Sequence, residues 1–73
     1  MPLRIDEMLV VVSEDNEGEG VCSFYTAAGW MPMVAADQAR LDSFREIAKD
    51  MARTSGKKIK ILKFSRRSLV EEF

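Results

Sequence analysis

Hydrophobic residues recur at helical spacing in the second half of the chain. Between residues 38 and 54, every third or fourth position is apolar: Leu41, Phe44, Ile47, Ala48 and Met51. This spacing gives an α-helix one apolar stripe and leaves its charged residues on the opposite side. Asp37 is a suitable N-cap before the first turn, and Gly56 is a suitable stop after the last. The pattern predicts an amphipathic helix from about residue 38 to residue 54.

The other apolar segments are short and rich in β-branched and aromatic residues, which favours strands. Residues 8–12 (MLVVV) predict a buried strand, followed by an acidic loop over residues 13–20. Residues 21–26 (VCSFYT) predict a second strand that forms a hairpin with the first. Gly29 can close a tight turn by taking a positive φ. Residues 30–34 (WMPMV) predict a third strand, at a sheet edge because Pro32 has no N–H for a ladder.

Beyond the helix, residues 58–61 (KIKI) alternate between polar and apolar as a half-buried strand does. The apolar residues are at odd positions up to Ile61 and at even positions, Leu62 and Phe64, after it, so they change from one face of the strand to the other. That shift predicts a bulge, or a strand whose far end is covered on both sides. Ser68 and Glu71 have capping-box spacing, which predicts a short helical turn within residues 65–73.

The order of these elements, β-β-β-α-β, predicts a single α+β domain over residues 1–73. We expect a small, mainly antiparallel sheet of three to four strands with one long helix packed on one face. A chain of 73 residues has room for one small core.

Composition excludes several classes of protein. No apolar run approaches the ~18 residues of a membrane span, and acidic residues near the start of the chain argue against a signal peptide. We therefore expect a soluble, cytoplasmic protein with no membrane partner. The chain has one cysteine and no histidine, so an internal disulfide and the usual zinc patterns are impossible. We expect no cofactor.

Charge is divided between the two halves of the chain. Residues 1–37 hold one basic residue against seven acidic ones, and residues 38–73 hold ten basic residues against five acidic ones. Residues 57–67 (KKIKILKFSRR) carry six positive charges. One hypothesis is that the acidic half offsets this basic segment across the folded domain. The alternative is nucleic-acid binding, for which the candidate residues are Lys58, Lys60, Lys63, Arg66 and Arg67.

Catalytic chemistry is hard to build from these residues. Without histidine, a general base near neutral pH would have to be a carboxylate or a lysine with a strongly shifted pKa. The sequence contains no pair of residues that indicates such a shift. A lone cysteine in a β-rich run, Cys22, is typical of a small buried hydrophobe. The acidic stretch Glu14 to Glu19 lacks the EF-hand order, so a solvated loop is favoured over a metal site. We predict a protein that is not an enzyme.

The segment Gly29-Trp30-Met31-Pro32-Met33 is the candidate partner-binding site. Trp and Met are enriched where proteins bind proteins, and the predicted edge strand presents both. Alternation puts Met31 and Met33 on one face and Trp30 with Pro32 on the other, so one pair faces away from the helix. Either Trp30 is the largest core residue, or Trp30, Met31 and Met33 form an interface with a host protein or with a second copy.

Residues 29–37 (GWMPMVAAD), followed by Ala39-Arg40 and by residues 63–67 (KFSRR), resemble small proteins encoded by tailed phages and prophages. The similarity covers roughly residues 20–70. It implies an intracellular, phage-borne setting, the host cytoplasm, and no particular chemistry. Because small phage proteins often bind a host protein, the resemblance favours a protein-interaction module. Apart from the resemblance, a homodimer is one form that such a module can take, and a small-ligand or metal-binding domain is a third interpretation.

Overall fold

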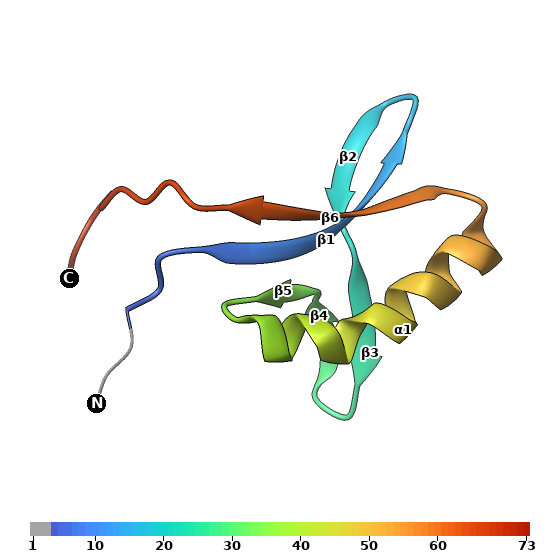
Figure 1. Ribbon diagram of the computed structural model, residues 1–73, viewed down its shortest axis with the longest axis horizontal. Helices are drawn as coiled ribbons and strands as arrows, with labels where there is room; N and C mark the ends of the chain where they lie inside the picture. Colours follow the sequence, from blue (N-terminus) through green and yellow to red (C-terminus); the bar gives the residue numbers. More distant parts are fainter. Residues whose placement is uncertain (1–3) are drawn as a thin grey trace.

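The longest strand, β1 (Met8–Asp15), lies at the centre of the main sheet. In the computed structural model, which describes residues 4–73, β1 pairs antiparallel with β6 (Lys58–Phe64) along one side (Figure 1). Along its other side it pairs antiparallel with β2 (Gly18–Val21) and β5 (Val34–Ala35). A separate antiparallel hairpin is formed by β3 (Ser23–Thr26) and β4 (Gly29–Pro32). The first three residues of the predicted domain lie outside the described part.

Three buried residues join the main sheet to the β3–β4 hairpin. The N–H of Val11 donates to the carbonyl of Met33 at 3.0 Å, Cys22 N–H donates to Val11 at 2.9 Å, and Met33 N–H donates to Cys22 at 2.9 Å. Cys22 links β2 to β3, and Met33 links β4 to β5. Buried backbone groups must be paired, and this ring of hydrogen bonds pairs them where the chain passes from the main sheet into the β3–β4 hairpin and back. We call these three residues the three-strand junction.

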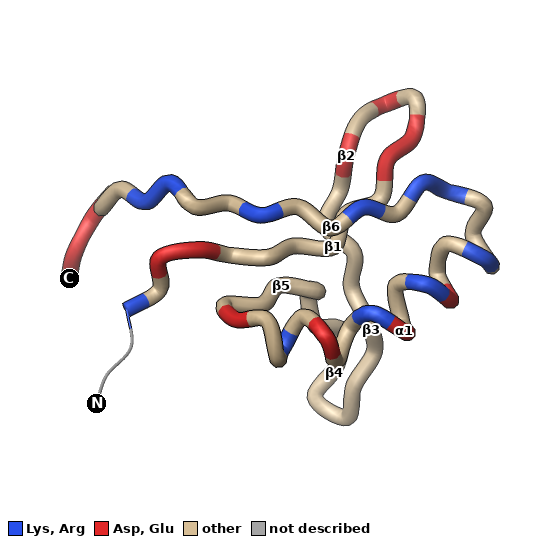
Figure 2. Tube along the Cα trace, in the orientation of Figure 1, with Lys and Arg blue, Asp and Glu red and all other residues tan. Residues whose placement is uncertain are grey.

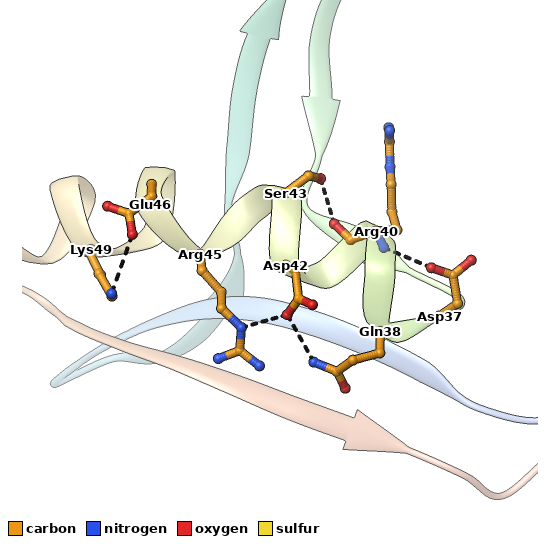
Figure 3. Close-up of polar contacts among 8 residues, drawn as sticks. All are labelled: Asp37, Gln38, Arg40, Asp42, Ser43, Arg45, Glu46 and Lys49. Atoms are coloured by element: carbon orange, nitrogen blue, oxygen red, sulfur yellow. Dashed lines mark hydrogen bonds and ion pairs between the residues drawn. The ribbon is translucent and has the colours of Figure 1, made fainter.

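Helix α1 (Gln38–Ser55) packs on one face of the main sheet, as the apolar stripe predicts. The Asp37 carboxylate accepts a hydrogen bond from the backbone N–H of Arg40 at 2.7 Å, and Gly56 ends the helix at φ +70°. Figure 3 shows this cap and two of the ion pairs along the helix. The ion pairs have i,i+3 spacing and join Asp42 to Arg45, Glu46 to Lys49, and Asp50 to Arg53.

The core lies between this helix and the sheet. Its buried members come from β1, the three-strand junction, β5 and the helix: Leu9, Val11, Cys22, Met33, Ala35, Leu41, Phe44 and Ala48. Antiparallel strands with one helix packed against them confirm the predicted α+β class.

The acidic stretch is folded more tightly than predicted. We expected a long loop over residues 13–20, but the register places Asp15 opposite Gly18, so only two residues join β1 to β2. The Asp15 carboxylate accepts a hydrogen bond from Glu17 N–H at 2.8 Å and closes this turn. Glu14 and Glu19 therefore lie opposite each other on paired strands.

Two expectations for the C-terminal part of the chain are wrong. Strand β6 has no bulge, since its register with β1 runs unbroken from Lys58 to Phe64. Its far end is not covered on both sides either, since Phe64 is 55% exposed. Residues 65–73 form no helical turn, and Leu69, Val70 and Phe73 are exposed. A helix this short does not offset its nucleation cost without packing, and in the described structure these side chains are exposed rather than packed on an apolar surface.

Candidate functional site

Two aromatic side chains lie side by side on the outer face of the β3–β4 hairpin. The two-residue loop Ala27-Ala28 sets the register and places Tyr25 directly opposite Trp30. Their ring centroids are 5.3 Å apart in an edge-to-face arrangement, which is a favourable geometry for aromatic pairs. Tyr25 is 72% exposed and Trp30 is 70% exposed. The hairpin therefore presents a large, prearranged apolar surface to solvent.

The turn of this hairpin is held by local hydrogen bonds. The Thr26 hydroxyl donates to the carbonyl of Gly29 at 2.9 Å and accepts from Ala28 N–H at 3.1 Å. Gly29 has φ +105°, a conformation that other residues rarely adopt, as the sequence predicts for this turn. These contacts fix the register on which the Tyr25–Trp30 pair depends.

The inner face of the same hairpin packs on the helix. The Phe24 ring lies 5.3 Å from that of Phe44, measured between centroids. Next to them is a groove of about 390 Å³, lined in part by Met31 from the hairpin and Ser43 from the helix. The guanidinium of Arg40 lies 5.2 Å above the Phe44 ring, a cation–π distance, and its side chain extends away from the helical ion pairs (Figure 3).

The three residues predicted to bind a partner occupy different environments. Trp30 is exposed and does not belong to the core. Met31 is 40% exposed at the rim of the groove. Met33 is completely buried, so it cannot take part in an interface; it fills the three-strand junction instead. The expectation for Met33 is corrected: it lies on the same side of the strand as Met31, and its backbone hydrogen bonds with Val11 and Cys22 hold it inside the core.

Tyr25 is the site residue that sequence reasoning missed. The alternation of Phe24 and Tyr25 predicts that at most one of the two rings is exposed, but it does not pair that ring with Trp30. The signal was present in the loop length, because a two-residue turn at Ala27-Ala28 places Tyr25 opposite Trp30.

The basic segment is paired with acids from the first half of the chain. Lys60 Nζ lies 2.5 Å from Glu14 Oε2 and 2.7 Å from Glu19 Oε2. Three longer contacts join Lys58 to Glu14 at 3.8 Å, Lys63 to Glu7 at 3.7 Å, and Arg67 to Asp6 at 3.9 Å. Figure 2 shows the acidic β1–β2 hairpin rising beside the lysines of β6. The predicted charge compensation is confirmed for four of the five candidate nucleic-acid-binding residues.

The shortest of these contacts shifts the pKa values of both partners. The hydrogen bond and charge of Lys60 hold the pKa of Glu14 below its ordinary value. Hydrogen bonds to Glu14 and Glu19 raise the pKa of Lys60. Both groups therefore stay charged at neutral pH. Arg66 is the one candidate residue for which no ion pair is found within residues 4–73.

The remaining candidate chemistry is limited. Cys22 is buried at the strand junction, and desolvation raises the pKa of its thiol, which keeps the sulfur protonated and unreactive at neutral pH. Within the described range, 4–73, no three acidic or cysteine side chains are grouped so that they could hold a metal ion.

Comparison with known proteins adds no relative: no protein-family model, curated protein or solved structure matches this chain. None of the helices in residues 4–73 combines the length and apolar character needed to cross a membrane.

Proposed function

We propose that this chain is a non-enzymatic protein-interaction module whose partner docks on the outer face of the β3–β4 hairpin. Tyr25 and Trp30 are the anchors, and Met31 lies at the rim. The observation that carries the proposal is the exposure of two paired aromatic rings on a structured hairpin. Aromatic anchors of this kind supply much of the binding energy in protein interfaces at little entropic cost.

The cellular location of the chain and the source of its partner are part of the same proposal. The resemblance to small proteins of tailed phages and prophages supports a host protein in the bacterial cytoplasm as the partner. Partner binding in that setting requires no chemistry on the chain itself.

The alternative function is nucleic-acid binding through Lys58, Lys60, Lys63, Arg66 and Arg67. The contacts of these residues argue against it, since a phosphate would have to displace carboxylates that already lie against the lysines. Binding to the phosphate backbone needs several uncommitted cations on one surface.

Affinity capture from a nuclease-treated bacterial lysate tests the proposal. Replacing both anchors (Tyr25→Ala with Trp30→Ala) should weaken retention of the captured partner by at least about 30-fold, which is the effect of losing a single anchor worth ~2 kcal/mol. Val21→Ala is the matched control, because Val21 is also exposed but lies on β2. Undiminished retention by the double variant contradicts the proposal. Capture of the partner from an untreated lysate that is lost after nuclease treatment supports the nucleic-acid alternative.

Tryptophan fluorescence gives a second measurement on the wild-type chain. Trp30 is the single tryptophan, so its emission reports on this surface alone. We expect emission typical of an exposed indole in the free protein and a shift to shorter wavelength when the captured partner is added. Binding without any shift would place the partner elsewhere.

A further inference from the structure

One edge of the main sheet is open. Among the described strands, β6 pairs with β1 alone. Val11 lies opposite Ile61, and both backbone groups of Val11 bond on the side of β1 away from β6. In an antiparallel ladder, alternate residues bond to alternate sides, so the backbone N–H and C=O groups of Ile59, Ile61 and Lys63 point to the open edge. Such an edge is a template for another strand.

The chain continues from this edge strand as an exposed arm, residues 65–73. The arm has no helix or strand and runs outward from the end of β6, away from the hairpin and the helix (Figure 1). Its apolar side chains Leu69, Val70 and Phe73 are each at least 78% exposed. Within residues 4–73, Glu71 and Glu72 have no ion-pair partner. The end of the arm, residues 69–73 (LVEEF), is acidic and apolar, which suits it to pair with a basic strand.

The molecule exposes more surface than a compact chain of its size. Its accessible surface is 6110 Å² for a mass of 8.3 kDa, against about 4,600 Å² for a typical folded monomer. Its radius of gyration is 13.9 Å, against about 11 Å for a compact domain of this length. The surplus exceeds the ~800 Å² that each partner buries in a standard interface.

We propose that two copies of this chain form a two-fold symmetric dimer in which the arm of each copy pairs antiparallel with the open edge of β6 of the other. With Arg67 of the two copies at the centre, Lys63 lies opposite Glu71 of the second copy. In the same register Phe64 lies opposite Val70 and Ile61 lies opposite Phe73. Opposite charges and apolar pairs at facing positions stabilise antiparallel strands. The two central arginines repel, but each lies 3.9 Å from Asp6 of its own chain.

A groove beside the open edge fits the arm of the second copy. It has a volume of about 190 Å³, lies between α1 and β6, and is lined by Ala48, Ala52, Ile59 and Ile61, with Arg45 and Lys49 at its border. Directly opposite residues in an antiparallel pair point to the same face of the sheet. Phe73 of the second copy, opposite Ile61, is therefore placed on the helix side, where this groove lies.

The dimer uses a surface separate from the aromatic hairpin. β6 lies along one side of β1, and the chain segment that leads from the hairpin into β5 lies along the other (Figure 1). Each dimer therefore carries two exposed Tyr25–Trp30 pairs, and the inference holds whether or not those pairs bind a partner.

Charge reversal at facing positions tests the register. Lys63→Glu gives a chain with acids at 63 and 71, and Glu71→Lys gives one with lysines at both. Each variant alone should dimerise at least about tenfold more weakly in sedimentation equilibrium, because two attractive pairs become repulsive. An equimolar mixture should recover the wild-type affinity, because both pairs are attractive in the heterodimer. Arg53→Glu is the control and should leave dimerisation unchanged, because Arg53 is exposed on α1 and does not line the groove between α1 and β6.

Hydrogen exchange tests the strand pairing itself. The backbone amides of Ile61 and Lys63 should exchange slowly in the wild-type dimer and rapidly in Val70→Asp, whose fold is checked by circular dichroism. A wild-type protein that remains at 8.3 kDa at NMR concentrations overturns the proposal. A dimer that is unaffected by Val70→Asp and by the charge reversals, or that is lost in Trp30→Ala, also overturns it, since another surface would then hold the two copies together.

Discussion

Trp30 and Phe44 are both large aromatic residues, but they lie in opposite environments. Trp30 contacts Tyr25 at the surface, whereas Phe44 is 2% exposed in the core. Trp30→Ala should therefore lower the free energy of unfolding by at most about 1 kcal/mol, the size of one cross-strand pair. Phe44→Ala should cost ~3–5 kcal/mol, enough to unfold a domain this small. Urea denaturation followed by circular dichroism measures both; an unfolded Trp30→Ala would instead assign Trp30 to the core.

The contact between Glu14 and Lys60 makes stability depend on pH. The pKa of Glu14 is lowered in the folded state, so its contribution to stability is full above the ordinary glutamate pKa of about 4.3 and is lost as pH falls through the folded value. We expect Lys60→Met to flatten the acid side of the stability profile measured by urea denaturation at successive pH values. Lys49→Met is the control, because Lys49 lies on the helix surface. An unchanged acid limb in Lys60→Met would contradict this role of the pair.

At the residue scale, the sequence predicts which faces are apolar but not how completely each is covered. Alternation correctly separates Met31 and Met33 from Trp30. It cannot reveal that Met33 is enclosed by a ring of backbone hydrogen bonds with Val11 and Cys22, because those contacts depend on segments more than ten residues apart. The exposure of Trp30 likewise depends on whether residues 65–73 cover it. They run away from the β3–β4 hairpin, so Trp30 stays exposed (Figure 1).

The ends of helix α1 are set by single residues. Asp37→Ala removes the carboxylate that accepts from Arg40 N–H, and we expect a loss of ~1 kcal/mol, which lowers the melting temperature by roughly 4–8 °C. The matched control is Asp50→Ala on the helix surface, which removes an exposed ion pair with Arg53 worth only a few tenths of a kcal/mol. Equal shifts for both variants would show that the cap has no special part in stability.

At the scale of elements, the helix was predictable because its signals are local. Its apolar period, cap, stop and i,i+3 pairs all come from residues within one or two turns of one another. The strands were harder, because their partners are set by contacts across the chain. Residues 13–20 have the composition of a loop, yet Glu14 and Glu19 join a ladder that places them around Lys60. The capping-box spacing in residues 65–73 predicts a helix that no neighbouring surface stabilises.

At the scale of the whole molecule, we expect charge compensation to limit what the basic segment can bind. Glu14→Gln combined with Glu19→Gln removes both carboxylates from Lys60 while keeping the shape of the side chains. We expect this variant to bind duplex DNA more tightly than the wild type at low salt. Its log–log salt dependence should be steeper by about 0.9 for each additional phosphate that the protein neutralises. Fluorescence anisotropy with labelled DNA measures both quantities. Wild-type binding as tight as that of the variant would contradict compensation.

The division of charge between the two halves was visible in the sequence, and so was the hypothesis that one half offsets the other. The individual partners were not, since they follow from the register of β1 with β2 and β6. The open edge of β6 and the exposed arm also emerge only at this scale, because the sequence of residues 65–73 favours a helix.

Photo-crosslinking from two positions in bacterial cells tests most directly whether the aromatic hairpin, rather than the basic segment, is the binding surface. A benzoylphenylalanine at position 25 keeps an aromatic ring beside Trp30, and the same residue at position 66 lies in the basic segment. We predict protein adducts from position 25 that disappear when Trp30→Ala is added, and no nucleic-acid adducts from position 66. Nucleic-acid adducts from position 66, with none to protein from position 25, would contradict the account.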